Sequence, residues 1–202
     1  MEHKDKEKHL LYYSLSEQVT HGMQVSNLAY EIGSRLKLSP EDCHELAVAG
    51  LLHDVGKMNL MQDSDLSEDS LMVEEMKYIR THPQKGYQKL QQRGYSDTIC
   101  QYVLYHHENY DGSGYPYNLR GQDIPLGARI LRVCDAFCAL ICDRPYRRAF
   151  SMEAAMELVI EEIKNFDMEV FLTFMRIIHD NPDRAVRMPE ITIDVKGELL
   201  KL

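Results

Sequence analysis

Apolar residues recur every three or four positions through most of this chain of 202 residues, which places them along one face of an α-helix. Residues 191–196 instead alternate apolar and polar side chains, as in a short β strand or an extended tail. We therefore predict an all-α fold with a single domain over residues 10–185, a charged N-terminal tail, 1–9, and a C-terminal tail, 186–202. The predicted helices cover residues 10–37, 40–52, 84–92, 96–107, 125–142 and 151–164, with one more around 73–79.

Several residues predict where these helices begin and end. Ser39 followed by Pro40 is typical of an N-cap and a first helical residue, and Ser151 is expected to start the last predicted helix. Gly33 lies inside the first helix, so a kink or an early end is expected there. The glycines and the proline of DGSGYP, residues 111–116, predict a tight loop.

The chain is acidic, with 23 Lys and Arg against 32 Asp and Glu, a formal net charge of −9 with neutral histidines. This balance argues against binding to duplex nucleic acid, which requires clustered positive charge. An anionic substrate must therefore be attracted by local positive charge, because the overall field opposes it.

Neither a membrane span nor a secretory signal is visible, since no stretch approaches the roughly 20 apolar residues that a membrane helix needs. The five cysteines show no C-x-x-C spacing. Three of them, Cys134, Cys138 and Cys142, recur every four residues and are expected to be buried on one helix face. We interpret this usage as that of a cytoplasmic protein with reduced thiols.

Eight histidines and carboxylates stand in positions typical of metal ligands. Two pairs are adjacent in the chain, one pair is four residues apart, and one carboxylate lies in an otherwise apolar helix, where burial without a partner is costly. The eight candidates are Glu17, His21, His53, Asp54, His82, His106, His107 and Asp135. Imidazole and carboxylate without thiolate suit iron, manganese or other divalent ions.

The number of candidates predicts more than one ion. Adjacent side chains on a helix diverge by about 100°, so His53 and Asp54 do not readily chelate one ion together. Eight ligands are too many for a single centre, and two or three ions fit them better. A single pair of this kind is more often structural, as we interpret His179 with Asp180, but the pairs taken together indicate a metal site.

Five segments occur in the order and approximate spacing of HD-GYP domains, a branch of the HD phosphohydrolase superfamily. They are LLHDVGK (51–57), THPQKG (81–86), HHENYDGSGYP (106–116), LRGQDIPLGARI (119–130) and CDAFCALICDRPY (134–146). A bare HD pair is unspecific, whereas HHE followed by DGSGYP is specific to this branch. The resemblance runs from about Glu17 to Asp167 and implies an HD-superfamily helical bundle.

The resemblance also implies an activity, which is metal-dependent hydrolysis of cyclic di-GMP to pGpG, GMP or both by a metal-bridged hydroxide. Seven candidates match the family's metal ligands, and Glu17 matches the extra acid of members with a third ion. Asp54 is expected to bridge the metals, with Lys57 as the second catalytic residue. The expected substrate contacts are Lys57, Asp111, Gly114, Tyr115, Pro116 and Arg144.

Departures from the family pattern keep other functions open. Cys138 stands where the family usually has Asp, Gln24 stands where it commonly has Arg, and residues 58–71 lack the family's usual signals. Gln24 is expected to affect a structural salt bridge rather than the chemistry. Cys138 and residues 58–71 favour a module that binds a cyclic dinucleotide with weak or no turnover, whereas the intact set of metal ligands disfavours it. Another cyclic dinucleotide such as cGAMP as substrate, and a di-iron oxygenase, are further alternatives. Residues 186–202 are interpreted as a surface tail, with a homodimer contact or a regulatory protein partner left open.

Overall fold

The computed structural model describes residues 15–59, 79–143 and 147–181, and within these ranges it contains α-helices and short 3-10 helices but no strand. The predicted all-α fold is therefore confirmed. The predicted helix around 73–79, both predicted tails and the alternating residues 191–196 lie wholly or largely outside the described residues. The α-helices are α1 (Leu15–Arg35), α2 (Pro40–Leu52), α4 (His82–Gln92), α5 (Asp97–Tyr105), α6 (Leu126–Ile141), α7 (Met152–Glu161) and α8 (Met168–Asp180). The 3-10 helices are η1 (Val55–Asn59), η2 (Gly121–Asp123) and η3 (Ile163–Asn165).

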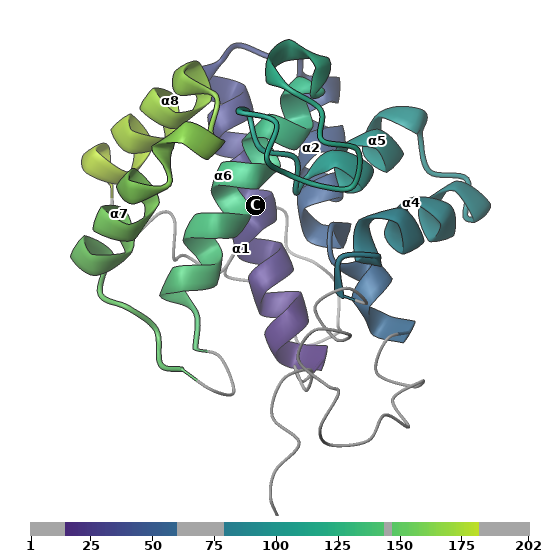
Figure 1. The fold of residues 1–202 in the computed structure, drawn as a ribbon, viewed down its shortest axis with the longest axis horizontal. Coiled ribbons are helices and arrows are strands. Elements are labelled where there is room, and N and C mark those ends of the chain that lie inside the picture. Colours follow the sequence, from purple (N-terminus) through teal and green to yellow (C-terminus); the bar gives the residue numbers. More distant parts are fainter. Residues whose placement is uncertain (1–14, 60–78, 144–146, 182–202) are drawn as a thin grey trace, which may run out of the picture.

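Helices α1 and α6 run beside each other through the middle of the molecule, with α2, α4 and α5 on one side and α7 and α8 on the other (Figure 1). The core between them is apolar and includes Phe137 of α6 and Phe174 of α8, whose rings meet edge to face with centroids 5.0 Å apart. Burying such aromatic side chains supplies much of the hydrophobic stabilisation of a helical domain.

The helix ends follow the capping chemistry of the sequence. Ser39, Ser96 and Ser151 each accept a hydrogen bond from a backbone N–H three residues later, as N-caps do. Pro40 follows Ser39 as the first helical residue, as predicted. Helix α1 continues through Gly33 and ends at Arg35. Gly33 packs closely against α2, because a Cβ at this residue would lie 3.1 Å from Leu46 Cδ2.

Three cysteines, Cys134, Cys138 and Cys142, were predicted to be buried on one helix face, and two of them are buried. Cys134 and Cys138 are fully enclosed in the core, whereas Cys142 is half-buried and donates to Gln24 Oε1 at 2.6 Å. None of the five cysteines forms a disulfide. Gln24, which departs from the family pattern, is thus a buried side chain of α1 that accepts a hydrogen bond from Cys142 at the end of α6.

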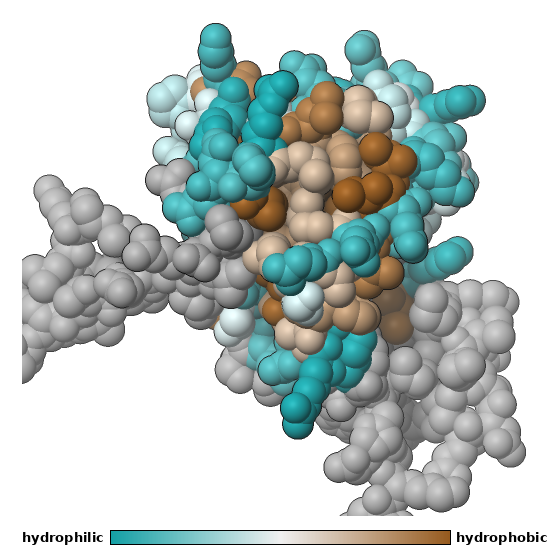
Figure 2. All heavy atoms as spheres, turned by 90° about the vertical axis from the view of Figure 1, so that its left-hand side faces the viewer, coloured by the Kyte–Doolittle hydropathy of each residue, from teal (hydrophilic) through white to brown (hydrophobic). Residues whose placement is uncertain are grey.

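The outer face of α7 and α8 carries apolar side chains (Figure 2). Ile160, Met168 and Leu172 are each nearly half exposed there, between 45% and 49%. None of the described helices is long and apolar enough to cross a membrane.

Candidate metal centre

Histidines and aspartates from five helices and their ends meet at one place in the core. His21 comes from α1, His53 and Asp54 follow α2, His82 begins α4, His106 and His107 follow α5, and Asp135 lies on α6. Within the described part of the chain, three overlapping groups bring their ligand atoms within 4.8 Å of one another. The groups are His82, His106 and His107; His21, His53 and Asp54; and His53, His106 and Asp135.

Three of these histidines each make the same type of hydrogen bond, to a backbone carbonyl three residues earlier. The Nδ1 atoms of His53, His82 and His106 lie 2.8, 2.7 and 2.6 Å from the carbonyl oxygens of residues 50, 79 and 103. Two of these carbonyls, those of residues 50 and 103, lie in the last turn of α2 and α5. The carbonyls of the last turn have no partner within the helix. A carbonyl only accepts, so Nδ1 carries the proton and Nε2 presents its lone pair to the centre, the tautomer that binds metals.

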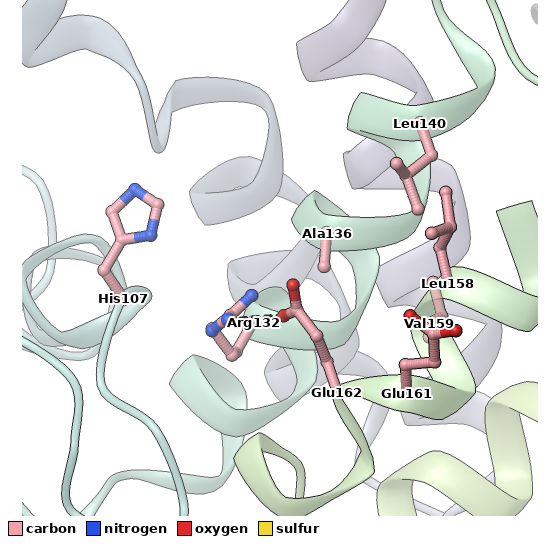
Figure 3. Close-up of a pocket in the computed structure, with 8 residues that line it drawn as sticks. All are labelled: His107, Arg132, Ala136, Leu140, Leu158, Val159, Glu161 and Glu162. Carbon is pink, nitrogen blue, oxygen red and sulfur yellow. Dashed lines mark hydrogen bonds and ion pairs between the residues drawn. The ribbon is translucent and has the colours of Figure 1, made fainter.

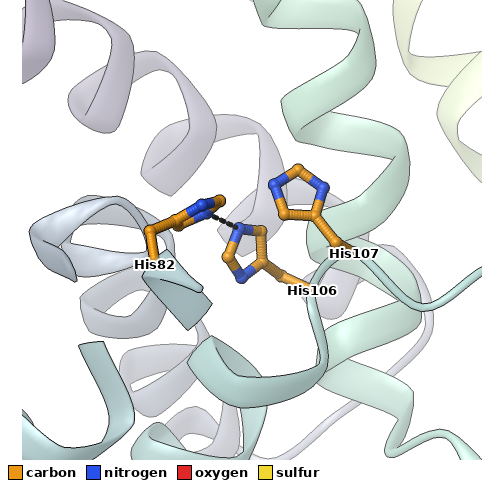
Figure 4. A group of neighbouring side chains, drawn as sticks. All are labelled: His82, His106 and His107. Atoms are coloured by element: carbon orange, nitrogen blue, oxygen red, sulfur yellow. Dashed lines mark hydrogen bonds between the residues drawn. The ribbon is translucent and has the colours of Figure 1, made fainter. Parts of the chain in front are cut away.

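The rings converge as this bonding requires. Figure 4 shows His82, His106 and His107 turned towards one another from α4 and from the end of α5. His82 Nε2 lies 3.2 Å from His106 Nε2, and the centroid of the His107 ring lies 4.1 Å from that of His106. Three imidazoles at these separations can coordinate a shared ion.

Two carboxylates complete the centre. Asp135 Oδ1 lies 3.0 Å from His21 Nε2 and 3.6 Å from His53 Nε2. Asp54 extends one oxygen to His82 Nε2, at 3.3 Å, and the other to His53 Nε2, at 3.5 Å. Asp54 therefore contacts both the group that contains His82 and the groups that contain His53.

Lys57 of η1 places a positive charge beside this carboxylate, with Nζ 2.7 Å from Asp54 Oδ2. Burial alone raises the pKa of Asp54, but Lys57 and the neighbouring His53 outweigh it and hold the pKa well below its usual value. Asp54 is therefore ionised at neutral pH.

Burial dominates the titration of the imidazoles around Asp54. It lowers the pKa of His82 to about 4 and that of His106 well below its usual value. Burial also lowers the pKa of His107 strongly, whereas at His53 the charges of Asp54 and Asp135 outweigh burial and raise the pKa. Most of the imidazoles are thus neutral at physiological pH, the form in which histidine binds metals.

Several buried polar atoms in the described residues have no hydrogen-bond partner, and three of them belong to this cluster. They are His21 Nδ1, His53 Nε2 and Asp54 Oδ1. Unpartnered buried polar atoms cost about 1–3 kcal/mol each, so their gathering in one place requires an explanation. Divalent cations coordinated by imidazole and carboxylate would satisfy such atoms, so the donor set fits a metal centre.

The eighth candidate lies apart from these groups. Glu17 is exposed in the first turn of α1, one helical turn before His21, and belongs to none of the three groups found among the described residues. Arg144, an expected substrate contact, lies outside the described residues. Cys138 lies fully buried in the core, three residues beyond Asp135 on α6.

A glycine holds η1 against α4, which brings the HD pair to His82. A Cβ at Gly56 would lie 2.0 Å from the carbonyl oxygen of His82 and 2.8 Å from the backbone N of Gly86. Only a residue without a side chain permits this approach. The glycine of LLHDVGK is thus a packing requirement of the site.

The loop after His107 is held by a residue that the sequence analysis assigned no role. Glu108 is buried, and its two carboxylate oxygens accept hydrogen bonds from the backbone N–H groups of Tyr117, at 2.6 Å, and Leu119, at 3.0 Å. An acid following two histidines and preceding a glycine-rich loop was the available signal. Glu108 fixes the loop that carries Tyr115 over the centre.

Other expected substrate contacts shape the same loop. Asp111 accepts from both the backbone N and the hydroxyl of Ser113, an Asx turn. Gly114 is buried, and a Cβ there would lie 2.2 Å from the backbone N of Asn109. Pro116 follows a cis peptide bond with Tyr115. These contacts account for the positions of the residues and leave their binding role a prediction.

Tyr115 lies directly over the cluster. Its ring stacks on that of His107, with centroids 4.7 Å apart and an interplanar angle of 22°. The guanidinium carbon of Arg80 lies 5.4 Å from the centroid of the Tyr115 ring. Tyr115 thus contacts both a histidine of the cluster and an arginine to which the sequence assigned no role.

Buried neutral imidazoles and ionised aspartates from several helices form a set of donors that suits a metal ion in an all-α protein. Comparison with known proteins identifies the family of this fold. Residues 5–170 match the model of the HD domain family, and the chain belongs to this family. The family prediction made from the motifs is confirmed.

Similar proteins share part of their length with this chain. It is 39% identical over 135 residues to the cyclic di-GMP phosphodiesterase response regulator RpfG of Xanthomonas campestris pv. campestris, covering 66% of this chain and 36% of RpfG. It is 32% identical over 158 residues to the 3'3'-cGAMP-specific phosphodiesterase 1 of Vibrio cholerae, covering 77% of this chain and 37% of that protein. The chain therefore spans little more than a third of the length of either relative. The solved structure of Bd1817, an HDG"Y"P protein from Bdellovibrio bacteriovorus, has the same fold, with a TM-score of 0.64 and 24% identity over 83% of this chain and 55% of that one.

Proposed function

We propose that this protein is a metal-dependent phosphodiesterase that hydrolyses cyclic di-GMP to pGpG, GMP or both. The observation that carries the proposal is the buried cluster of imidazoles and aspartates with unpartnered ligand atoms and Lys57 at its side. The similarity to a named cyclic di-GMP phosphodiesterase supports the substrate class.

We assign the ions, iron or manganese, to two groups of ligands that share Asp54. His82, His106 and His107 form one group. His21, His53 and Asp135, which contact one another, form the second group. Glu17, one turn from His21, is the candidate for a third ion. When bound, such ions supply a Lewis acid and lower the pKa of a coordinated water towards neutrality.

The side chains of this protein then have separate tasks. Lys57 lies half-buried at the edge of the cluster, where its ammonium group can neutralise a non-bridging phosphate oxygen as charge develops on it. Asp54 keeps the lysine in place through their 2.7 Å ion pair. Tyr115 offers a ring face or a hydroxyl to the nucleotide above the centre. Arg144 is proposed as a bidentate phosphate contact.

The first test is a product assay. Protein purified without oxygen and loaded with Mn²⁺ or Fe²⁺ is incubated with cyclic di-GMP, and products are followed by chromatography. The double variant His53→Ala/Asp54→Ala is expected to form no product, whereas His44→Ala, an exposed histidine outside the cluster, should match the wild type. Product from the double variant at the wild-type rate would contradict the proposal, and the ratio of pGpG to GMP bears on the third ion.

A different cyclic dinucleotide is the second candidate substrate. The similarity to a 3'3'-cGAMP-specific phosphodiesterase favours it, because cGAMP presents the same two phosphodiesters and one guanine. Parallel assays with both dinucleotides decide between them through the ratio of kcat/KM. Tight binding without product over hours would instead favour the binding module that Cys138 suggests. We place the protein in the cytoplasm, which the five cysteines without a disulfide support.

A further inference from the structure

A cavity of about 360 Å³ opens between α6 and the C-terminal part of α7, beside the metal cluster. His107 lines one end of it, and Arg132, Glu161 and Glu162 contribute polar groups (Figure 3). The volume lies within the roughly 300–1,000 Å³ typical of small-molecule sites. His107 thus belongs both to the metal cluster and to the lining of this cavity.

The polar groups of the cavity are held in place. Arg132 donates from Nε to Asn109 Oδ1 at 2.8 Å and from Nη2 to Glu162 Oε2 at 3.3 Å, and its guanidinium carbon lies 5.3 Å from the centroid of the Phe166 ring. Its side chain is 14% exposed, so the cation is fixed in the wall. Glu162 is 55% exposed and turns its carboxylate towards Arg132, as Figure 3 shows.

The remaining wall is apolar. Ala136 and Leu140 follow Arg132 at intervals of four residues on one face of α6, and Leu158 and Val159 come from α7. Such a wall suits the faces of a planar ring, whereas the guanidinium and the carboxylate suit polar atoms along its edge.

The pairing of a fixed guanidinium with a carboxylate selects among the nucleobases. Guanine offers two acceptors, O6 and N7, which an arginine contacts with two hydrogen bonds, and its N1–H and N2 amino group are donors that a carboxylate can accept. Adenine carries a donor, the N6 amino group, in place of O6, and it has no proton on N1. In this cavity adenine would turn a donor towards Arg132 and would offer Glu162 neither an N1–H nor an N2 amino group.

We propose that this cavity binds a guanine base, with Arg132 and Glu162 as the specificity-determining residues. The assignment of that base to the substrate rests on the proposed function. Arg132 is placed by Asn109, two residues after His107, so the base site is tied to the loop that completes the metal centre.

The test compares GMP with AMP, two probes that differ only in the base, by calorimetric titration into the metal-loaded protein. The wild type is expected to bind GMP at least about fivefold more tightly than AMP, because one good bidentate contact discriminates by roughly 1–3 kcal/mol. Arg132→Ala and Glu162→Gln should each remove most of this preference by weakening GMP, with AMP little changed. Glu162→Gln alters an exposed side chain, so this variant is expected to fold.

Two control variants separate recognition from general damage. Arg176→Ala removes an exposed arginine of α8 that does not line the cavity, and it should leave both affinities unchanged. Asn109→Ala frees Arg132 from the loop while keeping the guanidinium, and it should retain a preference for GMP.

Three results would overturn the proposal. They are equal affinities of the wild type for GMP and AMP, equal losses for both nucleotides in Arg132→Ala, and no measurable binding of GMP at millimolar concentration. Equal losses would identify Arg132 as a phosphate contact. A protein that prefers GMP through Arg132 but forms no product from any cyclic dinucleotide would keep this inference and remove the proposed activity.

Discussion

His82 Nε2 faces His106 Nε2 at 3.2 Å, while the Nδ1 atom of each ring is bonded to a backbone carbonyl three residues earlier. Because the carbonyls hold the protons on Nδ1, two lone pairs are directed at each other, an arrangement that is repulsive unless a cation lies between or beside them. An added proton is disfavoured, since burial lowers the pKa of both rings. A metal ion is the cation that this geometry favours.

Metal loading is expected to raise thermal stability. An ion present at 100 times its Kd adds about 2.7 kcal/mol to the free energy of unfolding. For a chain of this size that corresponds to roughly 5–10 °C in Tm. Differential scanning calorimetry with Mn²⁺ and after chelation measures the change. His82→Ala should lose it and the exposed-site variant His44→Ala should keep it. An unchanged Tm after chelation would contradict a structural contribution from the ions.

Lys57→Ala is expected to lower kcat by about 10²–10³-fold, the usual effect of removing one group that stabilises transition-state charge. Metal content, measured by elemental analysis, should stay the same, because no ligand is lost. Lys164→Ala, which removes an exposed lysine of η3, serves as the control. If Lys57→Ala lost its metal together with its activity, Lys57 would act by holding Asp54 rather than by contacting phosphate.

Glu108→Gln should destabilise the protein although it is nearly isosteric. The new amide would turn an NH₂ group towards the N–H donors of Tyr117 or Leu119, and a mismatch of this kind costs about 1–3 kcal/mol. Urea unfolding followed by circular dichroism gives the free energy of unfolding. Glu157→Gln, at an exposed position of α7, should change it by less than about 0.5 kcal/mol. Equal effects in the two variants would show that the loop does not depend on Glu108.

Gly114→Ala is expected to cost roughly 3 kcal/mol, because a Cβ would meet backbone atoms of Asn109 and Glu108 at 2.2 and 2.5 Å. Gly94→Ala is the comparison, since a Cβ there meets nothing within 4 Å and only the positive φ of +77° opposes it, at about 1–2 kcal/mol. The same unfolding measurement ranks the two variants. A smaller loss at Gly114 than at Gly94 would mean that the loop moves without cost.

The sequence predicted the fold class and which side chains come together, because both depend on local patterns. The repeat of apolar residues predicted α6 over 125–142, and the helix spans Leu126–Ile141. Adjacent His and Asp residues predicted a shared centre, and the structure brings seven of the eight candidates to it. Glu17, predicted from its four-residue spacing to His21 and from the family resemblance, is the one that lies outside the three groups among the described residues.

The features that could not be predicted depend on contacts between distant segments. The carbonyl partners of His53, His82 and His106 are backbone atoms, which carry no signature in the residue type. The bond between Arg132 and Asn109 joins residues 23 positions apart, and its existence depends on how the loop folds back on α6. The hydrogen bonds from the backbone of Tyr117 and Leu119 to Glu108 likewise depend on how the loop folds back.

The cluster also connects remote parts of the chain. His21 and Asp135 meet across a separation of 114 residues, and ions bound between them would tie α1 to α6 as a covalent cross-link does. None of the five cysteines forms a disulfide that could do so. In a cell short of the metal, the protein is therefore expected to open and be degraded as well as to lose activity, so its abundance would follow the metal supply.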